Sequence, residues 1–176
     1  MPLADIEQVP GKVWNSLATG AGPWRTPVLA TAGPQDGGDA RIVVLRAVST
    51  AERDLVFFTD RRSRKYRQLE NHPAACLLVY DEAQGVQVRL YGVVTREASE
   101  EMLDQWWRNL AAHQRSHYAA DASVPQTAGN GKGRENFTAF HVRIHRFHCL
   151  WIHDDGNEAA EFEWRDGRWP GRFCRP

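Results

Sequence analysis

The stretch Arg41-Ile-Val-Val-Leu-Arg46 opens the part of the chain that decides its fold. Two further apolar runs follow it, Leu55-Val-Phe-Phe-Thr-Asp60 and Val86-Gln-Val-Arg-Leu-Tyr-Gly-Val-Val-Thr95. Runs of this length and composition are typical of β-strands. Ser63-Arg-Lys65 stands between them and brings a hydroxyl and two cations to a turn. We interpret residues 41–95 as an antiparallel barrel whose turns form a phosphate-anchored cradle for a cofactor.

The composition is that of one ordinary globular domain. The chain has 176 residues, of which 42% are apolar and 25% are charged, and its 22 basic residues balance its 22 acidic ones. A zero formal charge argues against a nucleic-acid partner, and no apolar run approaches the ~20 residues of a membrane span. The N-terminus lacks the features of a signal peptide. Three widely spaced cysteines indicate a reducing setting, so we expect a cytoplasmic protein.

The pattern of apolar runs and turn residues predicts a mainly β fold, an antiparallel Greek-key or closed barrel with few helices. We expect a single domain over residues 1–176, made of a core barrel at about 24–98, a helical segment at about 99–120, a mobile loop at 121–136 and C-terminal strands at 137–176. Helices are expected at 10–20, after Ser63, at 99–110 and at 111–120. Strands are expected at 24–32, 40–48, 55–59, 74–80, 86–96, 137–145, 147–152, 160–164 and 168–173.

Arg41 and Arg46 flank four apolar residues on a predicted strand. Because positions 41 and 46 have opposite parity, the two side chains cannot point the same way unless the strand bends or ends between them. In one arrangement Arg46 points into a cleft, and the backbone between the arginines meets a planar ring. In the other, two arginines simply bracket a core strand.

Thr59, Ser63, Arg64 and Lys65 mark a predicted transition from strand to helix. The start of a helix offers free backbone N–H groups and the positive end of the helix dipole. Hydroxyls and cations at such a place can bind phosphate. The alternative is a solvated helix start with an incidental run of charges.

Three further sets of residues invite a functional interpretation. Gln87 could present its amide to a heterocycle, or it could be exposed on an edge strand. Trp151 could stack on a flat ligand or pack in the core. The series His141, His145, Cys149 and His153 shares strand parity, but a spacing of four puts neighbours about 13 Å apart, which is too far for two ligands of one metal. We therefore predict no metal site.

These motifs together resemble the FMN-binding split-barrel family typified by pyridoxamine 5'-phosphate oxidase, in order and in spacing. The resemblance is carried by Arg41-Ile-Val-Val-Leu-Arg46, Phe57-Phe-Thr-Asp60, Ser63-Arg-Lys65, Gln68-Leu69, Asn71-x-Pro73, Gln87-Val-Arg-Leu-x-Gly92 and the terminal Trp169…Arg172-Phe-Cys-Arg-Pro176. It is strongest from Val28 to Arg96 and looser beyond.

The resemblance implies that FMN is the cofactor and that the protein is a homodimer with FMN at the subunit interface. Gln87 and Trp151 are expected to reach the cofactor from the second subunit. The residues expected to bind it are Arg41, Ile42, Val43, Val44, Leu45, Arg46, Phe58, Thr59, Ser63, Arg64, Lys65, Gln87 and Trp151.

Departures from the family pattern shape the expected activity. Arg46 stands where the family has Lys, and Phe58 stands where it has Tyr. After Trp151 the family's arginine-containing run is replaced by the acidic stretch 152–158, which should disfavour a phosphorylated substrate. We expect an FMN-dependent oxidoreductase that acts on an unknown small molecule or a nicotinamide donor. The alternatives are a non-catalytic flavin- or haem-binding module and a genuine pyridoxamine 5'-phosphate oxidase. No residue is singled out as catalytic.

Overall fold

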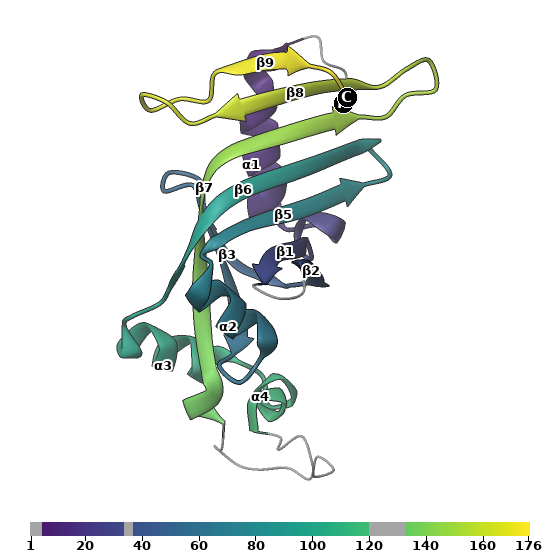
Figure 1. The fold of residues 1–176 in the computed structure, drawn as a ribbon. Helices are drawn as coiled ribbons and strands as arrows, with labels where there is room; N and C mark the ends of the chain where they lie inside the picture. Colours follow the sequence, from purple (N-terminus) through teal and green to yellow (C-terminus); the bar gives the residue numbers. More distant parts are fainter. Residues whose placement is uncertain (1–4, 34–36, 120–132) are drawn as a thin grey trace.

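A computed structural model describes residues 5–33, 37–119 and 133–176. Strands take up more of these ranges than helices do, and helices separate the runs of strands (Figure 1). In chain order the elements are η1 (Ile6–Gln8), α1 (Val9–Thr19), η2 (Gly22–Trp24), β1 (Val28–Gly33), β2 (Gly37–Ile42), β3 (Leu45–Ser49), β4 (Asp54–Asp60), α2 (Arg64–Asn71), β5 (Ala74–Asp81), β6 (Val86–Arg96), α3 (Glu100–Asn109), α4 (Ala112–Ala119), η3 (Arg134–Asn136), β7 (Phe137–Trp151), β8 (Glu158–Glu163) and β9 (Gly171–Cys174).

The strands form one antiparallel sheet that curls until its two ends meet. Seven of them follow the order β2-β1-β5-β6-β7-β4-β3, and β8 joins β7 to β9. The two end strands of this order, β2 and β3, are consecutive in the chain, with only Val43 and Val44 between them. Two extended residues span roughly 7 Å, so the two ends of the sheet must lie close together. The sheet is therefore wrapped into a barrel.

Strand β7 ties the molecule together along its length. Figure 1 shows β5 to β9 side by side, with α1 behind them, and β7 running on towards α2, α3 and α4. One edge of β7 pairs with β6 along nearly its whole length, while the other edge pairs with β4 near the start of the strand and with β8 near its end. The long strand thus connects the part of the sheet near the C-terminal hairpin with the part that carries the helices.

A β-bulge interrupts the pairing of β6 with β7. Tyr91 pairs with Arg146 and Gly92 with Ile144, so His145 has no partner of its own. A Cβ atom on Gly92 would lie 2.7 Å from the Cγ1 of Val142 and 2.9 Å from the carbonyl oxygen of Arg143. Only glycine fits at this close approach of two backbones.

The apolar side chains divide into two buried clusters. The larger one fills the barrel and includes Leu29, Phe57, Leu90 and Phe147 from four different strands. The smaller cluster lies where α3 covers the outer side of β4 and β7, through residues such as Leu103. Strand β4 contributes to both clusters, because alternate side chains of a strand point to opposite faces.

Most predicted elements are confirmed, and three differ for identifiable reasons. The predicted strand 40–48 is two strands, since the chain crosses from one end of the sheet to the other at 43–44. The strand predicted at 24–32 begins at Val28, because Gly22–Trp24 forms a 3-10 turn. The strands predicted at 137–145 and 147–152 are the single strand β7, in which the bulge absorbs the extra residue. Of the loop predicted at 121–136, residues 121–132 lie outside the described residues and η3 occupies 134–136.

The bulge also corrects the predicted parity of the histidine series. His141, His145 and Cys149 were expected on one face, but the extra residue reverses the alternation. Cys149 is buried in the barrel, His145 is exposed, and His141 is half-buried. His153 lies beyond the end of β7. The prediction of a shared face is therefore wrong.

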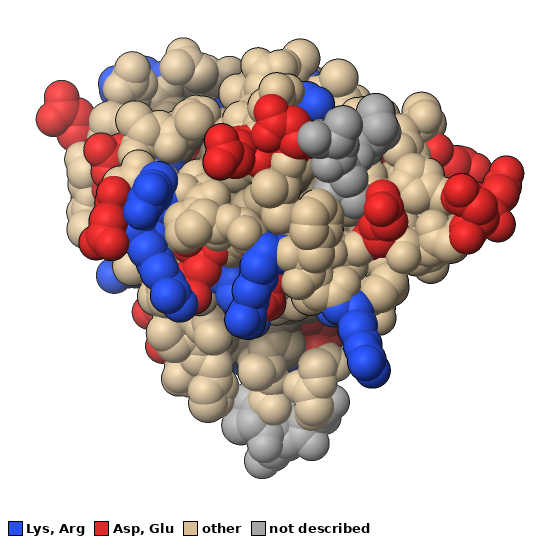
Figure 2. Space-filling view, turned by 90° about the horizontal axis from the view of Figure 1, so that it is seen from above, with Lys and Arg blue, Asp and Glu red and all other residues tan. Residues whose placement is uncertain are grey.

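The charged side chains are interspersed on the face of the molecule that Figure 2 shows, with blue and red atoms alternating across it. This mixture agrees with the balanced composition. Within the described residues, no helix is long and apolar enough to span a membrane.

Candidate flavin-phosphate site and its surroundings

The start of α2 is built as the sequence predicts. β4 ends at Asp60, and Ser63 caps α2 by accepting the backbone N–H of Tyr66 at 3.3 Å. The hydroxyl oxygens of Ser63 and Thr59 lie 3.2 Å apart. The first turn of a helix leaves N–H groups without partners inside the helix. Two hydroxyls therefore stand beside the positive end of an eight-residue helix.

Arg41 reaches this helix from β2 through a network that the sequence did not reveal. Its guanidinium donates to the Oγ1 of Thr31 at 2.6 Å and to the Oε1 of Gln68 at 2.7 Å. It also forms an ion pair with Asp39 at 2.6 Å. Gln68 and Thr31 are buried. Because Gln68 belongs to α2, the network fixes the Arg41 guanidinium against the helix.

The three partners of Arg41 carried only weak signals in the sequence. Asp39 precedes Arg41 by two residues and so shares its face of the strand. Gln68 lies four residues after Arg64, which is one helical turn. Thr31 lies on another strand and reaches the site only through the pairing of β1 with β2, where it stands opposite Asp39.

Lys65 and Arg64 complete the cations at this place. Burial lowers the pKa of Lys65, and the nearby charge of Arg41 lowers it further. The Nε of Arg64 lies 3.8 Å from the same carboxylate oxygen of Asp39 that pairs with Arg41. The structure thus brings Arg41, Arg64 and Lys65 together around the start of α2.

The segment 42–45 leads from Arg41 towards Arg46. The backbone N–H of Val43 donates to the carbonyl of Pro27 at 3.0 Å, and that of Leu45 donates to the carbonyl of Arg25 at 2.9 Å. The side chains of Val43 and Leu45 are buried, Val44 is half-buried, and Ile42 is 67% exposed. The segment is therefore anchored through the buried side chains of Val43 and Leu45, while that of Ile42 projects into solvent.

Arg46 contacts Phe58 on the outer side of β4, which α3 covers. The Arg46 guanidinium lies 5.4 Å from the centre of the Phe58 ring. The Phe58 ring is flanked by those of Trp106 and Phe137, with ring centres 5.4 and 5.0 Å away. The Nε of Arg46 is buried without a hydrogen-bond partner among the described residues. An orphaned donor in an aromatic setting indicates a place where a ligand atom can accept.

Gln87 and Trp151 lie away from the other predicted residues. Gln87 is half-buried on the outer face of β6, paired with the 48% exposed Tyr80 of β5. Since β6 lies between β5 and β7, the structure excludes the alternative in which Gln87 lies on an edge strand. Trp151 is fully buried in the barrel, and its indole N–H has no partner among the described residues. Its predicted contact with the cofactor stays a prediction, and it would require the side chain to leave the core.

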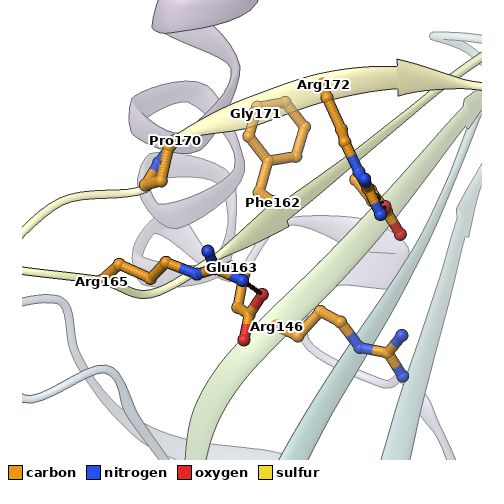
Figure 3. Close-up of a pocket in the computed structure, with 8 residues that line it drawn as sticks. Arg146, Phe162, Glu163, Arg165, Pro170, Gly171 and Arg172 are labelled. Carbon is orange, nitrogen blue, oxygen red and sulfur yellow. Dashed lines mark hydrogen bonds and ion pairs between the residues drawn. The ribbon is translucent and has the colours of Figure 1, made fainter.

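A cavity of 290 Å³ lies over the C-terminal hairpin, apart from all the predicted residues (Figure 3). Arg165 pairs with Glu163 there, and Arg172 pairs with Glu161. The Arg146 guanidinium lies 4.3 Å from the centre of the Tyr91 ring. Arg165 and Arg172 each have a carboxylate of their own, whereas Arg41 and Arg64 share that of Asp39. This cavity is therefore a weaker anion site than the start of α2.

Comparison with known proteins agrees with this geometry. The family model described as "Pyridoxamine 5'-phosphate oxidase" matches residues 25–150. The chain belongs to this family. The match includes every one of the predicted site residues except Trp151.

Curated members of the family are similar over part of the chain. The pyridoxine/pyridoxamine 5'-phosphate oxidase of Burkholderia lata is 43% identical over 76 residues, which are 43% of this chain and 35% of that protein. The enzyme of the same name from Granulibacter bethesdensis is 40% identical over 93 residues, 50% of this chain and 44% of that protein. These alignments span less than half of the curated relatives.

Two solved structures share the fold over nearly the whole chain. One is an FMN-binding protein related to pyridoxamine 5'-phosphate oxidase from Nostoc punctiforme, with a TM-score of 0.70 and 20% identity over 100% of this chain and 98% of that one. The other is PhzG from Burkholderia lata in complex with tetrahydrophenazine-1-carboxylic acid, with a TM-score of 0.74 and 16% identity over 97% and 92%. The predicted split β-barrel is confirmed.

Proposed function

We propose that the protein is an FMN-dependent oxidoreductase that binds its cofactor at the start of α2. The observation that carries this proposal is the meeting of the Thr59 and Ser63 hydroxyls with Arg41, Arg64 and Lys65. Three cations and two hydroxyls match a phosphate monoester, whose oxygens accept several charge-assisted hydrogen bonds. A residue set of this kind fits FMN and not a neutral flavin alone.

The lowered pKa of Lys65 supports phosphate binding. Lys65 is partly buried and lies beside the positive charge of Arg41, and both features destabilise its protonated form. A bound phosphate supplies negative charge and stabilises the protonated ammonium. Lys65 would therefore hold its proton more firmly in the complex, and the hydrogen bonds of Arg41 to Thr31 and Gln68 would keep its guanidinium in place.

The isoalloxazine ring is proposed to lie against the segment 42–46 and Phe58. Ile42 is 67% exposed, which leaves an apolar surface beside the backbone for a flat ring. The orphaned Nε of Arg46 offers a positive donor to an acceptor on that ring. When bound, FMN supplies hydride transfer through its N5 atom. This chain contributes orientation, charge and exclusion of water.

A second copy of this chain is the proposed partner. Phe58 pairs with Ala139 at one end of β7 and Trp151 ends the strand, 12 residues or about 40 Å of extended chain away. Gln87 pairs with Leu150, next to Trp151. One chain therefore does not bring Gln87 and Phe58 to the same small cofactor. Gln87 faces outward beside Tyr80, whose 48% exposure is high for a tyrosine in a sheet. A homodimer would cover this face and let Gln87 contact the FMN of the other subunit.

The substrate is proposed to lack a phosphate. The stretch after Trp151 contains Asp154, Asp155 and Glu158, and these are exposed. Negative charge here disfavours an anionic substrate, and a small neutral molecule or a nicotinamide donor fits better. The described free cysteines, Cys76, Cys149 and Cys174, suit the reducing cytoplasm that we propose as the location.

The first test is spectroscopic. The purified protein should be yellow, or should take up added FMN, with flavin absorbance that dithionite bleaches. A Lys65→Ala variant should bind FMN at least tenfold more weakly, since it removes a charge-assisted contact. The matched control is Lys12→Ala, a lysine of α1. A colourless protein that takes up no FMN would overturn the proposal.

Turnover separates an enzyme from a binding module. FMN reduction by NADH or NADPH, followed by reoxidation with an electron acceptor, is the expected result. The similarity to curated oxidases also favours a test with pyridoxamine 5'-phosphate, where release of hydrogen peroxide would establish that activity. Tight flavin binding without turnover on a panel of donors would assign the protein to flavin storage or sensing.

A further inference from the structure

We propose that Asp39 is a built-in counter-ion of the phosphate site, which neutralises its arginines when no phosphate is bound and weakens the site for phosphorylated ligands. The inference rests on the proposed function and adds a control on the affinity of the same site. It makes Asp39 the residue that sets how strongly the site prefers FMN over unphosphorylated riboflavin.

The contacts of Asp39 converge on one oxygen atom. Its Oδ2 lies 2.6 Å from the Nη2 of Arg41 and 3.8 Å from the Nε of Arg64. The same oxygen accepts the side-chain N–H of Gln68 at 3.1 Å. Donors from β2 and from α2 thus meet a single carboxylate oxygen. This is the arrangement in which a phosphate oxygen would be bound.

The electrostatic state of Asp39 agrees with this role. The hydrogen bond from Gln68 lowers its pKa the most. Burial opposes this lowering, but the hydrogen bond and charge of Arg41 and the charge of Arg64 add to it, so the pKa lies below its ordinary value. Asp39 is therefore ionised near neutral pH. Its side chain is 33% exposed, so an incoming anion can approach the same donors from solvent.

A phosphate and the Asp39 carboxylate cannot both hold the same donors. Each Arg41 N–H that points to Asp39 is unavailable to a ligand, and two anions at one site repel each other. Asp39 can yield because it stands on β2, which is an end strand of the sheet and, among the described strands, pairs with β1 alone. Phosphate binding must therefore turn the carboxylate away or proceed against its charge.

A ligand without phosphate does not meet this competition. Riboflavin has the same ring as FMN and lacks the charge that Asp39 opposes. Asp39 should therefore change the affinity for FMN and leave the affinity for riboflavin nearly unchanged. This difference separates a counter-ion from a residue that merely stabilises the fold, which would affect both ligands alike.

The test compares Asp39→Asn with the wild type by calorimetric titration at about 50 mM salt, where screening is modest. Asparagine keeps the shape and removes the charge. We expect FMN to bind roughly three- to tenfold more tightly to the variant, and riboflavin to bind within about twofold of the wild type. The ligand-free variant should melt at a lower temperature, because Arg41 loses its ion pair while Arg64 and Lys65 remain.

Two further variants control the comparison. Glu163→Gln removes a carboxylate that pairs with Arg165 on the far hairpin, and it should change neither FMN nor riboflavin binding. Asp39→Glu keeps the charge, and its ratio of FMN to riboflavin affinity should stay within about twofold of the wild type. If Asp39→Asn is too unstable to purify, Asp39→Ser replaces it with the same expected ratio.

Equal FMN affinity in Asp39→Asn and the wild type would overturn the inference and leave the proposed function intact. Weaker FMN binding by the variant would also overturn it, because Asp39 would then serve to position Arg41. If neither protein binds FMN, the proposed function fails, and inorganic phosphate decides the inference separately. Phosphate should raise the melting temperature of Asp39→Asn more than that of the wild type, and an equal or smaller rise would contradict the counter-ion.

Discussion

The guanidinium of Arg41 donates to the Oε1 of Gln68 over 2.7 Å, and the same oxygen accepts the hydroxyl of Thr31 at 2.9 Å. Gln68 also donates to Asp39, so its one amide serves three partners from β1 and β2. Because Gln68 is 5% exposed, water cannot replace it easily. The proposed phosphate site is therefore supported by a buried amide.

Gln68→Ala should accordingly weaken both the fold and the site. We expect a loss of about 1–3 kcal/mol in the free energy of unfolding, since buried donors lose their acceptor, together with weaker FMN binding as Arg41 becomes mobile. Urea unfolding and FMN titration measure the two effects. The matched control is Gln105→Ala on the exposed face of α3. Unchanged stability in Gln68→Ala would show that the network is dispensable.

If Lys65 binds the FMN phosphate as proposed, FMN binding should depend on pH. The pKa of Lys65 in the folded protein lies below its ordinary value of 10.5. In the ligand-free protein the Lys65 ammonium therefore loses its proton at a lower pH than an ordinary lysine does. The ammonium binds phosphate and the neutral amine does not. FMN affinity should therefore fall as pH rises through the lowered pKa of Lys65, even though the phosphate charge no longer changes there.

Lys65→Arg isolates this effect, because the guanidinium keeps its charge over the whole range. The dissociation constant of its FMN complex should change less between pH 7 and pH 10 than that of the wild type. Fluorescence quenching of FMN gives both curves. The same slope in both proteins would mean that another group titrates.

The side chain of His141 links Asp54, the first residue of β4, to Glu97, which lies shortly before α3. Its Nδ1 lies 2.6 Å from a carboxylate oxygen of Asp54, and its Nε2 lies 3.0 Å from one of Glu97. The bond to Asp54 raises the pKa of His141, and that to Glu97 adds to the effect in spite of partial burial. Burial opposes the lowering of the Glu97 pKa, but the Ser99 N–H and His141 outweigh it.

The signs of the two shifts define a pH window. A raised histidine pKa contributes stability that is full below 6.5 and is lost as pH rises through the folded value. The lowered pKa of Glu97 contributes stability that is full above 4.5 and is lost as pH falls through the folded value. His141→Gln should therefore cost the most, about 1–3 kcal/mol, between these limits.

Unfolding by urea across the pH range checks this window. The difference between His141→Gln and the wild type should shrink on the alkaline side and again at strongly acid pH. His145→Gln, at the exposed bulge residue of β7, should show no such profile. A pH-independent difference would point to lost packing instead of a charged histidine.

Gly92 tests whether the β6–β7 bulge is a steric requirement. Gly92→Ala places a Cβ 2.7 Å from Val142 and 2.9 Å from the Arg143 carbonyl, and should cost about 1–3 kcal/mol in unfolding free energy. Gly11→Ala in α1 meets no atom within 4 Å and should stabilise by about 0.5–1 kcal/mol. Opposite signs in thermal or urea unfolding are the expected result, and equal effects would contradict the steric argument.

The sequence predicted what depends on local pattern. Ser63 was expected to cap a short helix because it stands directly before the run from Arg64 to Glu70, and the structure confirms this cap. The strands of the barrel follow from their apolar alternation. Features that depend on pairing between strands far apart in the sequence could not be predicted. The two-residue crossing at 43–44 and the bulge opposite Gly92 are such features, because both arise from how the sheet closes.

The same division applies to the site. Arg41, Ser63 and Lys65 belong to a local motif and were found. Asp39 and Thr31 acquire their meaning only when β2 pairs with β1, which brings them opposite each other. The face of Gln87 followed from the parity of β6, but its place on a central strand required the strand order.

The proposed homodimer is tested on the outer face of the sheet. Tyr80 is 48% exposed and Val93 is 47% exposed, and they lie on the adjacent strands β5 and β6. If a second copy covers this face, Tyr80→Glu places a charge in the contact, and the protein should sediment as a monomer at micromolar concentration. FMN affinity should fall with it, because Gln87 is the register partner of Tyr80. Phe173→Glu on β9, at a residue 60% exposed, is the control and should leave both properties unchanged. A Tyr80→Glu variant that remains dimeric, or a wild type that is monomeric with full FMN affinity, would place the partner contact elsewhere or remove the need for it.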